Sequence, residues 1–439
     1  MTLTALLRRK GLAALAALAV AAPACTFDVT NPNNPSEADV VSTAEGIRAL
    51  AVGLQQYYAN TALEAIIMYP GVTSRELTIN ITYLGMEMLE DGGDALSGSA
   101  GQVSAYWSRL VRVMSMSEKL LTYAPDVTLD PGTRSGIIAM AHLYKALAIA
   151  HLSQAFEQVL LDTDPDENAT FHPRAEAMAA VLDHLDQAEQ TLQATPQSDE
   201  FRTRVIGASF DLDEAITFFR ARYSLIAGDY DAAIAAANAV DPASVSYFSY
   251  DALYPNPVYV LVNEIRYYAA RDGMGTPVTE AGDGRLDFYL VPLDTVSNPK
   301  LYPIDGLAGF FTTQTAPIPV YIPGELALIR AEAHLRNGDL ASAVAEIDAV
   351  RTKTPAQDPL GIGAGLPPYS GPVSVAALEE EIYRQRAAEL FLTGMRFEDS
   401  RRLGRPGPPA DLTERNRNWY PYPTQERLNN PNTPPDPSS

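Results

Sequence analysis

The sequence predicts an all-α protein in which helices pack in pairs and long irregular loops interrupt them, with only minor β-structure. Three observations support this class. Apolar residues recur at helical spacing in several segments, a Gly-Asp segment occurs twice, and 33 prolines and 28 glycines are spread over 439 residues. Proline inside a helix removes a backbone hydrogen bond, so this many prolines require long loops between the helices.

Helical periodicity is clearest in the first half of the chain. Ser42 and Glu45 have the spacing of a capping box, and apolar residues follow at intervals of three and four, so a helix is expected to begin there. Further helices are expected over 106–121, over 133–156 and from Pro173 onward. The helix over 133–156 is apolar on several faces, which indicates burial between neighbours.

Two later segments repeat one another at an offset of 110 residues. The copies are Ala221, Leu225, Gly228, Asp229, Tyr230 and Ala233, and Ala331, Leu335, Gly338, Asp339, Leu340 and Ala343. The spacing is typical of tetratricopeptide helix pairs, in which alanines allow close helix approach and glycine takes the left-handed turn. We therefore expect a tetratricopeptide-like right-handed superhelix interrupted by insertions, the largest over residues 247–319. Such insertions commonly gather on the binding face.

The start of the chain predicts export and lipidation. Residues 1–24 combine a basic stretch, a short apolar run and small residues before Cys25, which is the pattern of a signal peptide. The apolar run is shorter than the roughly 20 residues of a membrane-spanning helix. The small residue before Cys25 resembles a bacterial lipobox, in which the thiol is acylated. The alternative is an ordinary signal peptide followed by a chance cysteine.

The remaining chain divides into three parts by composition. Residues 25–41 contain too little apolar surface to pack and are expected to form a tether from the lipid. Residues 42–430 are expected to form the folded helical-repeat domain. The tail over 431–439 is rich in proline and is expected to be frayed.

Charge and motifs exclude several classes of function. The chain has 32 Lys and Arg against 54 Asp and Glu, a net charge of −22, and no basic stripe, so nucleic acid is not an expected partner. The five histidines form no H-E-x-x-H motif, and no G-x-S-x-G, P-loop or dinucleotide motif occurs. The histidines also show no paired ligand spacing, so we expect no metal site, no cofactor and no catalysis, although counting acidic pairs alone does not exclude a glycosidase dyad.

An acidic loop follows the predicted buried helix. It consists of Asp162, Asp164, Asp166 and Glu167. Calcium prefers such oxygen ligands, but the sixth position has no glycine and Pro173 replaces the closing glutamate of an EF-hand. A solvated loop is favoured over a calcium site.

The C-terminal part of the chain carries a long motif. Residues 384–404, RQRAAELFLTGMRFEDSRRLG, resemble the E-R-R-x-E-L-x-F-E-G-x-R-x-x-D-L-x-R-x-G motif of the SusD/RagB family of outer-membrane nutrient-binding lipoproteins. The segment YPYP at 420–423 and the NNPN at 429–432 are similar to the family's closing segments. Thr393 and Ser400 depart from the motif, where the family usually has Glu and Leu.

The resemblance implies a function that the residues alone do not establish. It implies a lipoprotein anchored to the outer membrane that binds an oligosaccharide or peptide and partners a TonB-dependent transporter. The alternative is an envelope scaffold that binds only proteins, as many tetratricopeptide arrays do. Within the motif, Glu389, Arg396, Asp399 and Arg402 have spacings suited to charge-assisted hydrogen bonds, and we interpret them as structural.

Tyrosines are the candidate ligand-binding residues. The chain has 22 tyrosines and 2 tryptophans, and eight tyrosines lie between residues 247 and 302. A tyrosine ring offers an apolar face and a hydrogen-bonding tip to a sugar or a peptide. Tyr83, Tyr254 and Tyr302 adjoin Pro, Asn or Gly in predicted loops and are the ligand-binding candidates. The alternative is that most rings simply pack, as we expect for Tyr267 and Tyr268.

Overall fold

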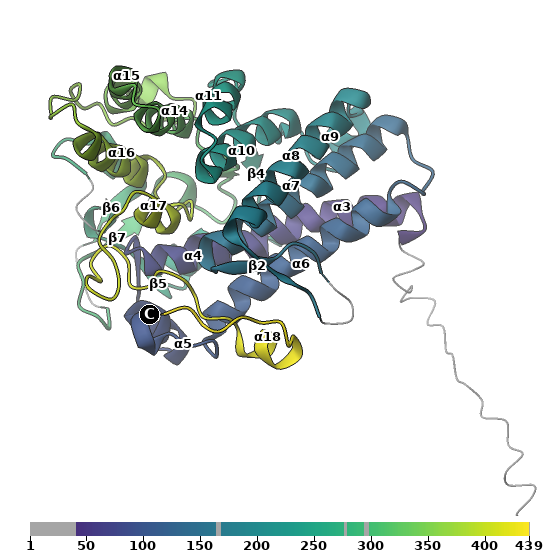
Figure 1. Cartoon of the computed structure of the whole chain (residues 1–439), viewed down its shortest axis with the longest axis horizontal. Coiled ribbons are helices and arrows are strands. Elements are labelled where there is room, and N and C mark those ends of the chain that lie inside the picture. Colours follow the sequence, from purple (N-terminus) through teal and green to yellow (C-terminus); the bar gives the residue numbers. More distant parts are fainter. Residues whose placement is uncertain (1–40, 164–167, 276–278, 294–297, 439) are drawn as a thin grey trace, which may run out of the picture. The chain divides into compact units, whose positions relative to one another are not determined.

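The computed structural model describes residues 41–163, 168–275, 279–293 and 298–438, which are mainly helical, so the predicted fold class is confirmed (Figure 1). Residues from Val41 onward form one compact unit. Cys25, the signal peptide and the tether up to residue 40 lie outside the described residues. So does most of the acidic loop, because only Asp162 of its four acidic residues is described.

Helices of 6 to 25 residues fill the first half of the unit. They are α3 (Ala44–Tyr57), α4 (Leu63–Thr73), α5 (Leu84–Asp91), α6 (Gly101–Tyr123), α7 (Pro131–Ala155), α8 (Arg174–Ala194) and α9 (Asp199–Arg204). The first of them is capped by Thr43 rather than Ser42, because the Thr43 hydroxyl accepts from the Gly46 amide at 3.0 Å. The predicted capping box at Ser42 is wrong by one residue.

Helix α7 is buried on nearly all sides, as its sequence predicts. It is the one helix among the described residues that is long and apolar enough to cross a membrane. Its apolar window is almost entirely covered by the rest of the protein, since α6 and α8 pack along it. Helix α7 is therefore the core helix of this half of the unit.

The two repeats form the expected helix pairs. The first is α10 (Leu212–Ala227) with α11 (Tyr230–Ala239), and the second is α14 (Glu325–Arg336) with α15 (Leu340–Arg351). Gly228 and Gly338 take φ values of 87° and 82° at the turns. Asp229 and Asp339 cap the second helix of each pair. Helices α11 and α14 pack together, so the pairs lie side by side (Figure 1).

The C-terminal region is divided into α16 (Val375–Glu389), α17 (Arg396–Arg402) and α18 (Thr424–Asn429). The expected single helix from Ser374 to about Leu403 is interrupted, because Leu392 and Gly394 have φ values of 55° and 82°. A side chain at Gly394 would collide with the carbonyl of Ile66, so α4 packs directly against this turn.

The described tail over 431–438 is held against the domain, so the prediction of a frayed tail is wrong for these residues. The Asp436 carboxylate accepts from the Tyr422 amide at 2.9 Å. The Arg417 guanidinium donates to the carbonyl of Pro437 at 3.2 Å. These two contacts to the loop between α17 and α18 hold residues 431–438 in place, although their composition alone predicts disorder.

In the described part of the chain, three small antiparallel sheets accompany the helices. The four-stranded sheet has the order β1-β5-β7-β6, with β1 (Leu77–Ile79), β5 (Tyr268–Arg271), β6 (Leu290–Pro292) and β7 (Ile304–Leu307). The two-stranded sheets pair β2 (Gln158–Leu160) with β3 (Phe171–Pro173) and β4 (Tyr247–Phe248) with β8 (Ile318–Pro319). The register of the larger sheet places Leu77 opposite Ala270 and Ala270 opposite Asp305.

The insertion over 247–319 is thus partly ordered into strands. It also contains the short helices α12 (Pro257–Tyr259) and α13 (Gly284–Tyr289). Residues 258–262 are rich in valine and leucine, which favours a strand, but they lie in α12 and the π-helical turn that follows it, because Asn256 caps this segment through its side chain. Strand β5 of the insertion pairs with β1, which lies almost 200 residues earlier in the chain, and β7 and β6 extend the same sheet.

Candidate functional site

The three tyrosines proposed from the sequence lie at three separate places. Tyr83 is 63% exposed at the N-terminal end of α5. Tyr254 lines a pocket of about 240 Å³ beside α3. Tyr302 lines a pocket of about 600 Å³ at the end of the four-stranded sheet. The structure does not bring them together, so each must be judged as a candidate by itself.

The other tyrosines of the insertion divide between packing and exposure. Tyr250, Tyr268 and Tyr289 are buried in the core. Burial raises the pKa of Tyr268 well above its usual value. Tyr267 is 43% exposed, so the expectation that it packs is wrong. Tyr267 directly precedes Tyr268, the first residue of β5. Adjacent side chains in an extended segment point to opposite faces, so when Tyr268 points into the core Tyr267 points outward.

The pocket that contains Tyr302 is assembled from four segments that are far apart in sequence. We call it the arginine–tyrosine pocket, and it is lined by Arg75, Arg271, Asp272, Gly275, Tyr302, Pro303, Leu412 and Thr413. These residues come from the link between α4 and β1, the end of β5, the loop before β7 and the loop after α17. The sheet therefore positions most of the pocket.

One buried carboxylate holds both arginines of the pocket. The Glu90 side chain accepts from Arg75 Nη1 at 3.3 Å and from Arg271 Nη2 at 2.7 Å, and its second oxygen accepts from the Ile79 amide. Arg75 Nε also donates to the carbonyl of Leu412 at 3.1 Å. Burial, together with the neighbouring Arg271 guanidinium, lowers the pKa of Arg75. Two guanidinium groups thus share one buried carboxylate.

Tyr302 is held in a defined orientation. The guanidinium carbon of Arg271 lies 3.8 Å from the centroid of the Tyr302 ring, which is the geometry of a cation–π contact. Asn298 fixes the backbone beneath it, because its amide donates to the Tyr302 carbonyl at 2.6 Å and its carbonyl accepts from the Tyr302 amide. The ring is half-buried and still lines the pocket.

Backbone geometry brings two walls of the pocket close together. Arg75 has a φ of 67°, which is uncommon for a residue with a side chain. Gly275 has a φ of 91°, and a side chain there would collide with the carbonyl oxygen of Arg75. Glycine is therefore required at position 275 for this approach.

The C-terminal motif holds these same walls through Arg396. Arg396 Nη1 donates to the carbonyl of Met274 at 2.6 Å, and its Nε lies 3.5 Å from the Glu76 carboxylate. Glu76 and Met274 directly adjoin Arg75 and Gly275 in the chain. Arg396 does not itself line the pocket, but it holds together the two segments that contain Arg75 and Gly275.

The other motif residues bind charged partners in the interior, away from the pocket. Glu389 pairs with Arg285 at 3.3 Å and with Lys353, Asp399 pairs with Arg386 at 2.8 Å, and Arg402 pairs with Asp399 and Glu332. Burial raises the pKa of Asp399 to about 6, against the opposing effect of Arg386. These contacts join α14, α16 and α17, which supports our interpretation of the motif as structural.

A second pocket lies between the two repeats. It measures about 420 Å³ and is lined by residues of α11, α14 and α15 and by the loop after α15. Its charged groups are paired within the protein, since Arg330 binds Glu346 at 2.7 Å and Lys353 binds both Asp358, at 2.6 Å, and Glu389. Because it lies on the repeat pairs, this pocket is the candidate surface for the alternative in which the protein binds only protein partners.

The arginine–tyrosine pocket is suited to binding a polar ligand. It combines guanidinium groups, the Asp272 carboxylate and an aromatic ring. Such groups can hydrogen-bond to ligand hydroxyl groups while the ring contacts an apolar ligand face. Among the described residues, no group of three or more His, Cys, Asp and Glu side chains is placed to hold a metal ion.

The sequence pointed to Tyr302, which lines this pocket, but it did not point to the two arginines beside it. Arg75, Arg271 and Glu90 belong to no motif, and Glu90 is separated from Arg271 by 181 residues. The sequence marked this region only weakly, because Gly275 and the Tyr302-Pro303 pair indicate turns but not a pocket.

Comparisons with known proteins support the resemblance to the SusD family. The family model described as "SusD family" matches residues 311–436, which include the C-terminal motif. No curated protein matches the sequence.

Solved structures share the fold over most of the chain. A putative sugar binding protein from Bacteroides vulgatus is 15% identical with a TM-score of 0.67, over 90% of this chain and 98% of that protein. A SusD superfamily protein from Bacteroides thetaiotaomicron is 15% identical with a TM-score of 0.68, over 90% and 100%. NanU from B. fragilis is 14% identical with a TM-score of 0.64, over 92% and 99%. The predicted resemblance is confirmed at the level of the motif and the fold.

Proposed function

We propose that this protein binds a nutrient, primarily a carbohydrate, in the arginine–tyrosine pocket and delivers it to a TonB-dependent transporter at the outer membrane. The pocket is the observation that carries the proposal. Structural neighbours described as sugar-binding and SusD-like carbohydrate-binding proteins support the choice of cargo. A peptide remains the alternative cargo.

The arrangement of Arg271 and Tyr302 suits a sugar ring. A sugar presents hydroxyl groups around its edge and C–H groups on its faces, so it requires hydrogen-bond donors beside an aromatic surface. Arg271 is fixed by Glu90 on one side and by its contact with Tyr302 on the other. A pre-ordered guanidinium loses less conformational entropy when it binds a ligand than a free surface arginine does.

The delivery step is supported by the family resemblance and by the predicted N-terminal anchor. Acylation at Cys25 would attach the protein to the membrane, and the tether over 25–41 would let the domain move over a neighbouring barrel. Cys25 lies outside the described residues, so the anchor remains a proposal from the sequence.

A binding screen with matched variants tests the site. Purified protein is tested against panels of oligosaccharides and peptides by calorimetry, followed by Tyr302→Ala and Arg271→Gln. We expect Tyr302→Ala to weaken binding by roughly fivefold to tenfold, as loss of an aromatic contact of about 1 kcal/mol predicts. Arg271→Gln should weaken it by about tenfold or more, because a charged donor is lost.

Tyr254→Ala is the matched control, since Tyr254 is a partly exposed tyrosine in the same insertion that lines a different pocket. It should leave affinity and melting temperature near the wild-type values. If Tyr254→Ala abolishes binding and Tyr302→Ala does not, the pocket beside α3 is the site. If no oligosaccharide or peptide binds but proteins bind between the repeats, the scaffold alternative is correct.

A further inference from the structure

Two histidines on neighbouring helices face each other away from the arginine–tyrosine pocket. His142 lies on α7 and His184 on α8, and their Nδ1 atoms are 3.0 Å apart. The ring centroids are 5.2 Å apart, so the nitrogens are the closest parts of the two rings and point toward each other. Both side chains are only partly buried, so the pair is open to small solutes.

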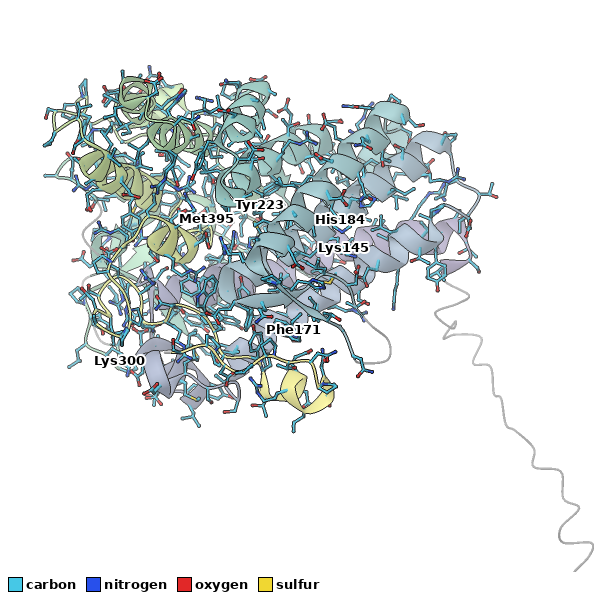
Figure 2. All side chains as sticks on the ribbon, in the orientation of Figure 1. Lys145, Phe171, His184, Tyr223, Lys300 and Met395 are labelled. Carbon is cyan, nitrogen blue, oxygen red and sulfur yellow. The ribbon has the colours of Figure 1, made fainter. Side chains whose placement is uncertain are left out.

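The surroundings of the pair are net acidic. Lys145, one turn after His142, lies 3.1 Å from the Glu118 carboxylate and also pairs with Asp162 (Figure 2 labels Lys145 and His184). Burial and the positive charge of Lys145 lower the pKa of both rings, and the negative charge of Asp183, which adjoins His184, acts in the opposite direction. The Lys145 ammonium group is itself paired with Glu118 and Asp162, so carboxylates offset this cation beside the two rings.

We propose that His142 and His184 bind one divalent transition-metal ion, Zn²⁺ or Cu²⁺, through their Nδ1 atoms. Imidazole is a preferred ligand of both ions. Among the described residues no third His, Cys, Asp or Glu side chain completes a site, so water supplies the remaining ligands.

The geometry requires only a small adjustment. Bonds of about 2.0–2.1 Å at a tetrahedral angle place the two nitrogens about 3.4 Å apart, a few tenths of an ångström more than the present separation. The rings must also turn so that their lone pairs converge on the ion. In the metal-free pair one Nδ1–H donates to the other Nδ1, so on binding the donating ring shifts this proton to its Nε2.

Metal titration of protein purified without a polyhistidine tag tests the proposal. We expect one equivalent of Zn²⁺ to bind by calorimetry, and Cu²⁺ to show nitrogen hyperfine coupling from two imidazoles by electron paramagnetic resonance. His142→Gln and His184→Gln should each weaken binding by roughly tenfold or more. His172→Gln and His334→Gln are the matched controls, because these partly exposed histidines lie elsewhere and should leave binding unchanged.

Wild-type affinity in both His142→Gln and His184→Gln would overturn the proposal. A second measurement needs no variant, and it decides the question if the variants fail to fold. Diethyl pyrocarbonate modifies free imidazoles, and mass spectrometry locates the modified residues. Zn²⁺ should protect His142 and His184 but not His172. Equal modification of these two histidines with and without Zn²⁺ would show that the pair is only a hydrogen-bonded packing contact.

Discussion

At the scale of single residues, burial decides which chemical groups are available for function. Glu90 is almost fully buried, so its charge is used to position Arg75 and Arg271 and is not offered to solvent. A buried carboxylate left without its partners is strongly destabilising. We therefore interpret Glu90 as the residue that keeps the pocket arginines in place.

His151 predicts a dependence of stability on pH. It lies in the core, with Tyr58 Oη at 3.3 Å from Nε2, and burial lowers its pKa to about 3. The ordinary pKa in an unfolded chain is about 6.5, so between these values the unfolded state binds a proton that the native state does not. The free energy of unfolding should therefore fall as pH decreases from about 6.5, by up to about 1.4 kcal/mol per pH unit.

Urea unfolding at several pH values between about 5 and 7 measures this effect. His151→Gln removes the titrating group, so the variant should lose this part of the pH dependence, whatever its stability at neutral pH. His172→Gln is the control, because His172 is partly exposed and pairs with Glu176. Parallel pH profiles for the wild type and His151→Gln would contradict the prediction.

At the scale of elements, the turns of the two repeats show how local sequence specifies local structure. The glycine at each turn has a positive φ, and the following aspartate caps the next helix by accepting from a backbone amide. Both features depend on residues within one turn, so they could be predicted without knowledge of the fold.

Removal of one cap tests this interpretation. The Asp229 carboxylate accepts from the Ala232 amide at 3.0 Å. Asp229→Ala should lower the free energy of unfolding by about 1 kcal/mol, because the amide loses its acceptor. Asp229→Asn keeps an acceptor oxygen and should retain most of the stability. Chemical denaturation distinguishes the two variants, and equal losses in both would show that charge rather than capping matters.

The division between α16 and α17 shows where local sequence was insufficient. Periodicity predicts one helix from Ser374 to about Leu403, but Leu392 and Gly394 adopt positive φ where α4 approaches. The Leu392 amide then donates to Glu76 at 3.0 Å instead of continuing a helical ladder. A tertiary contact with a segment some 300 residues away therefore ends the helix.

At the scale of the whole molecule, the anchor is the first feature to test. Cys25→Ser should yield protein without an acyl group, which mass spectrometry of the mature N-terminus measures. The wild type should carry a diacylglyceryl modification on Cys25 and partition into the membrane fraction. An unmodified Cys25 thiol in membrane-extracted wild-type protein would contradict the lipoprotein proposal.

If the protein delivers its ligand to a transporter, the two proteins should form a stable complex. Gentle detergent extraction should recover the protein with a barrel protein larger than itself, on the order of a hundred kilodaltons, as the family resemblance and the size of large barrels imply. Purification through an affinity tag followed by mass spectrometry identifies the partner. Repeated recovery of the chain alone, under several extraction conditions, would count against delivery to a transporter.

The sequence by itself determined the helical class, the two repeats, the C-terminal motif and the family resemblance. Each of these is read from short segments of continuous sequence, in which periodicity and turn chemistry act locally. Only the tertiary structure decided the binding geometry. Arg271 meets Glu90 across 181 residues and His142 meets His184 across 42, because sheet pairing and helix packing bring them together. No local sequence pattern predicts such contacts, since they depend on how distant elements bury their apolar faces.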